Sequence, residues 1–303
     1  MSVKPDPGAY GPDHRSPWLG VDWREHQRWL RAEGCHVNVI DLGDGPPLVF
    51  VHGLGGSWQN WLEQLPVFAE SYRCIALDLP GFGASPEPEH EISIPGYGRV
   101  VDAVCEQLEL DPAVLVGNSM GGFVGCEVAV QFPERMDKLV LVSSAGISSE
   151  QLHRRPLLTG ARMGTMIAEW VGTHSDMLAR RPRARALLTA GVFRHPTRLP
   201  APLVAEQMRG SGTPGFIDAF DALMSYRIRD RLGDISVPTL VVWGTGDRLV
   251  PVKDADEFVK LIPEADKVIF EDTGHTPQLE RPAAFNEVLR EFVAAGERTP
   301  EQV

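Results

Sequence analysis

Three polar residues of this 303-residue chain each follow an apolar run, and together they could carry out nucleophilic catalysis. Ser119 follows the buried-strand pattern of residues 113–116, and Asp247 and His275 follow two further patterns of the same kind. A serine hydroxyl is a poor nucleophile near neutral pH, so it needs a base, and the base needs an orienting carboxylate. Serine, histidine and aspartate supply one group for each of these tasks.

The surroundings of Ser119 predict a sharp turn between a buried strand and a buried helix. Residues 123–132 are apolar almost throughout and end before a proline, as a helix would. In such a turn the serine takes strained backbone angles, and only small residues fit two positions away, where Gly117 and Gly121 stand. The N–H of Met120 then lies at a helix N-terminus, where it could hold an oxyanion.

A second glycine-rich bend, HGLGG at residues 52–56, follows the strand predicted over residues 48–51. Such a bend leaves backbone N–H groups without strand partners, and we expect the N–H of Leu54 to be the second oxyanion donor. His52 is expected to orient this loop and not to take part in catalysis.

The strand-end positions also distinguish the candidate base and acid from the other histidines and aspartates of the chain. Of nine histidines, only His52 and His275 come directly after a predicted strand. Asp254 and Asp256 are alternative acids, but they fall in the first turn of a predicted helix, where acidic residues interact favourably with the helix dipole. The sequence therefore points to Asp247 and His275.

The order of predicted elements indicates the α/β class, with a mostly parallel central sheet flanked by helices. Because parallel strands end at one edge of a sheet, the three polar segments are expected to lie together. A helical cap is expected over residues 147–231, inserted after the sixth strand, because helical patterns occur there without a buried strand. The core then comprises residues 36–146 and 232–303, preceded by an N-terminal arm and a short helix in residues 1–35, the helix over residues 22–31.

The composition restricts partners and cofactors. A net charge of −12 and an isoelectric point near 5.2 disfavour a nucleic-acid partner, because phosphate binding needs clustered positive charge. No run of 18 apolar residues occurs, so we expect no membrane insertion, and a cytoplasmic location is the default prediction. The four cysteines lie far apart without a C-x-x-C pair, so we expect buried thiols, no metal and no disulfide framework. We also expect no cofactor.

These motifs resemble those of the α/β-hydrolase fold superfamily, in its serine-nucleophile, esterase- or lipase-like branch. The run GNSMG at residues 117–121 matches the nucleophile elbow of that family, and the order serine, aspartate, histidine matches its triad order. The bend at residues 52–56, the turn at residues 78–85 and the pair Gly274-His275 match three further family segments. Serine in place of aspartate at the elbow argues against the haloalkane dehalogenase and epoxide hydrolase branches.

The resemblance implies roles for five residues. His275 takes the Ser119 proton as the hydroxyl attacks an acyl carbon, and Asp247 stabilises the resulting imidazolium. The N–H groups of Leu54 and Met120 hold the oxyanion, and water later releases the acyl group from the serine.

From this resemblance we expect an enzyme that hydrolyses carboxylic esters of apolar acyl groups, with a small apolar ester as its substrate. The residues expected to line its pocket are Trp58, Met163, Met166, Trp170 and Phe220. The alternative is the meta-cleavage-product group of carbon–carbon bond hydrolases, which the chain resembles in GNSMGG at residues 117–122. Those enzymes typically carry a tryptophan directly after the catalytic histidine, whereas Thr276 stands here. A third and weaker alternative is a non-catalytic ligand-binding protein.

Overall fold

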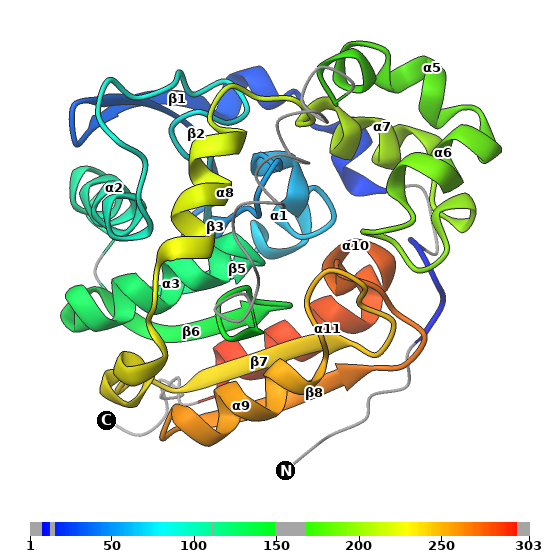
Figure 1. Ribbon diagram of the computed structural model, residues 1–303. Helices are drawn as coiled ribbons and strands as arrows, with labels where there is room; N and C mark the ends of the chain where they lie inside the picture. Colours follow the sequence, from blue (N-terminus) through cyan, green and yellow to red (C-terminus); the bar gives the residue numbers. More distant parts are fainter. Residues whose placement is uncertain (1–7, 13–15, 111, 149–167, 296–303) are drawn as a thin grey trace.

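The computed structural model describes residues 8–12, 16–110, 112–148 and 168–295, and Figure 1 shows a central sheet between layers of helices. Its strands are β1 (Gln27–Ala32), β2 (Cys35–Leu42), β3 (Pro47–Val51), β4 (Arg73–Leu77), β5 (Ala113–Asn118), β6 (Met136–Val142), β7 (Thr239–Gly244) and β8 (Ala265–Phe270). The strand order is β1-β2-β4-β3-β5-β6-β7-β8. Strand β2 pairs antiparallel with β1 and β4, and the other neighbours are parallel. The predicted mostly parallel sheet is confirmed.

The two apolar faces of the sheet explain the helical layers. The inner parallel strands are buried on both faces, and their side chains alternate between two core clusters. The first cluster includes residues of α2 (Ile94–Gln107), α3 (Met120–Gln131) and α9 (Lys253–Leu261). The second includes residues of α1 (Leu65–Phe68) and α11 (Pro282–Ala294), which therefore cover the opposite face.

Two segments differ from the prediction. The short helix expected over residues 22–31 is a 3-10 helix, Trp23–His26, followed by β1, which pairs with β2 at the edge of the sheet. The helical spacing of Trp58, Trp61 and Leu65 predicts one helix over residues 57–69, but the structure has a 3-10 helix, Trp58–Trp61, followed by α1. Pro66 accounts for this break, because a proline has no N–H to continue a helix that began at residue 58.

The segment between β6 and β7 is helical where the structure describes it. Residues 168–231 contain α5 (Ser175–Ala179), α6 (Pro182–Thr189), α7 (Ala201–Arg209) and α8 (Phe216–Ser225), and no strand. Figure 1 shows α5, α6 and α7 grouped in green, whereas α8, in yellow, lies beside α2. That residues 147–231 form a cap domain stays a prediction.

Further described elements are short helices: Pro17–Gly20, Pro133–Arg135, Pro196–Arg198, Arg229–Asp234 and α10 (Pro277–Glu280). Residues 168–173 are helical as well. Helix α10 leads directly into α11, so the loop after β8 is followed by two helices in succession. Among the described residues, every helix is too short or too polar to cross a bilayer.

Candidate active site

The turn that carries Ser119 has a strained backbone. Ser119 joins the end of β5 to the start of α3 with φ 55° and ψ −117°, outside the regions that residues with a side chain favour. Its N–H donates to the Val142 carbonyl oxygen at 2.9 Å, and its own carbonyl oxygen accepts the Ala145 N–H at 3.0 Å. The end of the neighbouring strand β6 therefore fixes the turn.

Gly117 and Gly121 stand where the turn leaves no room for a side chain. A Cβ atom on Gly121 would lie 2.6 Å from the His52 carbonyl oxygen and closer still to that of Val51. A Cβ atom on Gly117 would lie 2.6 Å from the Gly122 nitrogen and closer still to the Gly121 carbonyl group. The obstructing atoms are all backbone, so both glycines are a steric requirement of the elbow.

His52 is a structural part of the loop that follows β3. Its buried ring accepts the Leu79 N–H at Nε2, at 3.0 Å, so the ring proton lies on Nδ1 and is donated to the Gly53 carbonyl oxygen at 2.7 Å. Burial lowers the pKa of His52, which keeps the ring neutral. These contacts agree with the prediction that His52 orients the loop.

Asp247 and His275 meet as the sequence predicts. Asp247 Oδ2 lies 2.8 Å from His275 Nδ1, and the two side chains are 0% and 6% exposed. Asp247 Oδ1 accepts the N–H groups of Leu249 and Val250 at 2.8 and 3.0 Å, so the orientation of the carboxylate is fixed. A carboxylate in this position holds the imidazole proton on Nδ1 and leaves Nε2 to accept a proton.

Ser119 and His275 line one cavity, but within the described residues no hydrogen bond joins the hydroxyl to the ring. Catalytic hydrogen bonds are often long before substrate binds, so this separation is compatible with their predicted roles. Asn118 connects the two segments, because its Nδ2 donates to the carbonyl oxygens of Val142 at 3.0 Å and His275 at 3.3 Å. Among the described residues no group of three or more His, Cys, Asp or Glu side chains could hold a metal ion.

The cavity above Ser119 has a volume of about 700 Å³ and mostly apolar walls. Its larger apolar lining residues include Leu54, Val171, Phe193, Met208, Phe216, Phe220, Leu223 and Met224. Of the residues expected in the pocket, Phe220 lies in this lining.

The two expected oxyanion donors lie near Ser119 in the chain or in the cavity. Leu54 lines the cavity, and Met120 begins α3 directly after the serine. That the amides of Leu54 and Met120 hold an oxyanion stays a prediction.

Two tryptophans expected in the pocket lie outside its lining. Trp58 packs against Trp23, with ring centroids 4.8 Å apart. Trp170 is 50% exposed and stacks on His174 at 4.6 Å. The helical spacing of Trp58 with Trp61 and of Trp170 with Val171 predicts an apolar helix face, but it does not show which neighbour that face meets. Met163 and Met166, the other two expected pocket residues, lie outside the described residues.

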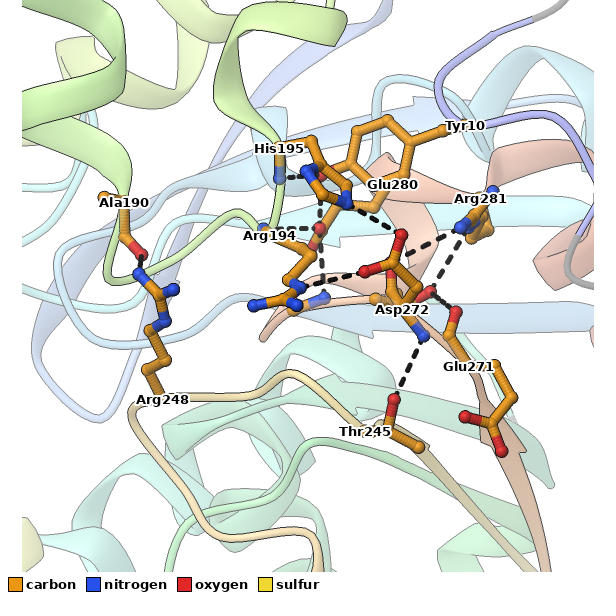
Figure 2. A network of polar contacts seen from close by, with 12 residues as sticks. Tyr10, Ala190, Arg194, His195, Thr245, Arg248, Glu271, Asp272, Glu280 and Arg281 are labelled. Atoms are coloured by element: carbon orange, nitrogen blue, oxygen red, sulfur yellow. Dashed lines mark hydrogen bonds and ion pairs between the residues drawn. The ribbon is translucent and has the colours of Figure 1, made fainter.

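Sequence patterns did not reveal a polar network that contacts the loop carrying His275. Figure 2 shows Tyr10, Arg194, Asp272 and Glu280 within this network. At its centre is the buried carboxylate of Glu280, which accepts hydrogen bonds from Tyr10, Arg194 and the His275 loop. Asp272 lies 2.9 Å from the Arg194 guanidinium and 2.7 Å from the His195 ring, and the Arg194 and His195 hydrogen bonds lower the pKa of its carboxyl group. No local motif marks these residues, because their partners are far apart in the sequence.

Comparison with known proteins identifies the fold independently. The family model described as alpha/beta hydrolase fold matches residues 46–282. A 2-hydroxy-6-oxo-2,4-heptadienoate hydrolase of Pseudomonas putida is 31% identical over 284 residues, which cover 88% of this chain and 96% of the relative. A 2-hydroxy-6-oxo-6-phenylhexa-2,4-dienoate hydrolase of Burkholderia cepacia is 30% identical over 275 residues, covering 86% and 92%. A solved meta-cleavage product hydrolase has a similar fold, with a TM-score of 0.70 at 24% identity, covering 89% and 98%.

These relatives contradict the prediction of a carboxylic ester hydrolase with an apolar ester as substrate. They are named as hydrolases of 2-hydroxy-6-oxo-dienoates, which is the class of the alternative drawn from GNSMGG at residues 117–122. Thr276 in place of a tryptophan is too weak a feature to argue against this class. A single residue after the histidine forms one part of a cavity wall and does not by itself determine the reaction.

Proposed function

The chain belongs to the alpha/beta hydrolase fold family, and we propose that it hydrolyses a carbon–carbon bond of a 2-hydroxy-6-oxo-dienoate. Family membership makes the protein a hydrolase, whereas the bond and the substrate are the proposal. The observation that carries the proposal is identity of 30% and 31% to two hydrolases of such dienoates, over 86% and 88% of the chain. The proposal is further supported by the cavity, because Ser119 and His275 both line it.

The proposed reaction begins with a change in the substrate itself. Conversion of the 2-hydroxy-dienoate to its 2-oxo tautomer moves the hydroxyl proton to C5 and leaves C6 as a ketone. The bond between C5 and C6 can then break heterolytically, because the electron pair left on C5 is conjugated with the 2-oxo group. What the reaction requires from the protein is a nucleophile at C6 and a group that carries protons.

Ser119 and His275 are proposed to supply these two groups. His275 Nε2 takes the serine proton as Oγ attacks C6, Asp247 stabilises the imidazolium, and the amides of Leu54 and Met120 hold the oxyanion. When the bond from C5 to C6 breaks, the imidazolium returns its proton to the departing dienolate, and the acyl group stays on Ser119. A water molecule deprotonated by His275 then attacks the acyl group and releases a carboxylic acid. The net change is the addition of one water molecule across the carbon–carbon bond.

The lining of the cavity supports a substrate with a sizeable apolar group on C6. Among the described lining residues none is Asp, Glu, Lys or Arg. Phe216 and Phe220 stack with ring centroids 6.4 Å apart, and Met224 lies one helical turn beyond Phe220 on α8. An aromatic group against these side chains gains both apolar burial and ring contacts. We therefore propose that a 6-phenyl dienoate is preferred over a 6-methyl dienoate.

The test is a kinetic assay with the 6-phenyl and 6-methyl dienoates. The expected result is loss of the dienoate absorbance with release of benzoate from the 6-phenyl substrate and acetate from the 6-methyl substrate. We expect kcat/KM to be about tenfold or more higher for the 6-phenyl compound. Ser119→Ala serves as the control for serine-dependent turnover. Absence of Ser119-dependent cleavage of both compounds would contradict the proposal.

A further inference from the structure

We propose that Glu280 is a positioning residue that holds the His275 loop and one wall of the cavity in a single arrangement, with Tyr10 as its anchor in the N-terminal arm. The inference rests on the triad proposed above and not on the identity of the substrate. Glu280 ends α10, is 0% exposed and belongs to the network drawn in Figure 2.

Three successive N–H groups of the His275 loop donate to fixed acceptors. The Gly274 N–H donates to Glu280 Oε2 at 3.0 Å, and the Thr276 N–H donates to Glu280 Oε1 at 3.2 Å. Between them, the His275 N–H donates to the Val192 carbonyl oxygen at 2.8 Å. Glu280 therefore holds the loop on both sides of the histidine, and a shift of its carboxylate moves the imidazole relative to its aspartate partner.

The same carboxylate holds the segment that forms one wall of the cavity. The Arg194 N–H donates to Glu280 Oε2 at 2.8 Å, and Val192 and Phe193, directly before it, line the cavity. A Cβ atom on Gly274 would lie 2.7 Å from both the Arg194 nitrogen and the Val192 carbonyl oxygen. The wall and the loop thus pack backbone to backbone, and one side chain sets the position of both.

Tyr10 completes the arrangement from the beginning of the chain. Its hydroxyl donates to Glu280 Oε2 at 2.5 Å and accepts the His195 N–H at 2.8 Å. The guanidinium groups of Arg198 and Arg281 lie 5.1 and 4.9 Å from the centroid of its ring. The arm is therefore joined to both segments that Glu280 connects.

Glutamine cannot replace this carboxylate without conflict, because every partner that faces Glu280 is a donor. The Thr276 hydroxyl donates to Oε1 at 3.3 Å, beside the N–H of the same residue. The NH₂ group of a glutamine would face an N–H group on one side or the other.

Glu63 offers a matched control, because it is also buried and accepts hydrogen bonds from Ser16 and Trp18 of the arm. Its described partners do not include the His275 loop.

The test compares wild type, Glu280→Gln, Tyr10→Phe and Glu63→Gln in two measurements. The first is the rate constant for inactivation by diisopropyl fluorophosphate, which reacts with a base-activated serine whatever the natural substrate is. The second is the downfield proton NMR signal of the His275 Nδ1–H bonded to Asp247, assigned by its loss in His275→Gln. Circular dichroism establishes that each variant is folded.

We expect Glu280→Gln to react about tenfold more slowly and to shift or broaden the His275 signal, because the imidazole is displaced from its aspartate. Tyr10→Phe, which keeps the loop contacts of Glu280, is expected to react about threefold more slowly. Glu63→Gln is expected to match wild type in both measurements.

Two results would overturn the positioning role: wild-type behaviour of Glu280→Gln in both measurements, or an equal loss in Glu63→Gln. If wild type does not react with the fluorophosphate, the proposed serine chemistry fails. The NMR comparison then decides the role of Glu280 by itself.

Discussion

The two sides of the candidate site are built differently. The backbone holds Ser119, through a strained φ, through Gly117 against the start of α3 and Gly121 against the end of β3, and through hydrogen bonds to the end of β6 and the loop after it. Side chains hold His275, chiefly Asp247 from the loop after β7 and Glu280, which connects it to Tyr10 and to the segment before α7. The serine side is therefore fixed by backbone contacts at the edge of the central sheet, and the histidine side by side-chain contacts that reach the N-terminal arm.

This difference predicts how each side fails. A change on the serine side meets backbone atoms of the central sheet, which cannot move without disrupting the core. A change on the histidine side meets side chains and a connecting segment, which can shift while the core stays folded. Substitutions on the serine side should therefore lower the stability of the protein, whereas substitutions on the histidine side should lower its activity.

The largest effect expected on the histidine side comes from Asp247→Asn. The amide oxygen can still accept the N–H groups of Leu249 and Val250, which turns the NH₂ group toward His275 Nδ1 and favours the wrong tautomer of the ring. We expect kcat to fall about 10³- to 10⁴-fold, with a melting temperature close to that of wild type. Steady-state kinetics and a thermal melt check both statements, and a small loss of kcat would remove Asp247 from the mechanism.

The glycines give the most direct contrast in stability. Gly121→Ala places a methyl group against the carbonyl oxygens of Val51 and His52, so we expect a loss of about 4 kcal/mol or more, or no soluble protein. Gly274→Ala meets the Val192 and Arg194 backbone and the Glu280 carboxylate, which lie outside the central sheet, so we expect a loss of about 1–3 kcal/mol and a folded protein of low activity. Urea unfolding measures both values, and equal losses would contradict the comparison.

Phe220 and Trp170, both between β6 and β7, allow a matched test of the cavity lining. Phe220→Ala removes a ring from the lining, so we expect KM for the 6-phenyl dienoate to rise about tenfold. Trp170→Ala removes a half-exposed ring outside the lining, so we expect a change in KM of less than about twofold. Measured KM values decide, and a larger effect at Trp170 would move the substrate site toward α5.

The smallest effect concerns pH and the buried ring of His52. Burial lowers its pKa in the folded protein, so as the pH falls below about 6.5 the unfolded chain takes up this proton more readily than the folded one. Stability therefore falls as the pH falls from about 6.5, with a limiting slope of about 1.4 kcal/mol per pH unit for this one group. Urea unfolding at pH 7.5, 6.5 and 5.5 should give a smaller slope for His52→Gln than for wild type. Equal slopes would mean that His52 titrates normally in the folded state.

The same comparison explains what the sequence could predict. The sequence pattern of the elbow is local, so two glycines and an apolar run were enough to predict the turn at Ser119. The strand-end positions were enough to predict that Asp247 and His275 lie together. Glu280 and Tyr10 are 270 residues apart, and no spacing relates them. The prediction that Trp58 and Trp170 line the pocket was wrong for a similar reason. Helical periodicity indicates the apolar face of a helix but not the element that covers this face.

The most direct test of the proposed function is the ratio of two kcat/KM values measured on the same protein, for the 6-phenyl dienoate and for p-nitrophenyl benzoate. Both substrates would leave the same benzoyl group on Ser119, so the ratio compares only how the bond to that group is broken. We predict a value for the dienoate at least about 100-fold higher, with both activities lost in Ser119→Ala. A higher value for the ester, with Ser119 still required, would contradict carbon–carbon bond hydrolysis as the function of this chain.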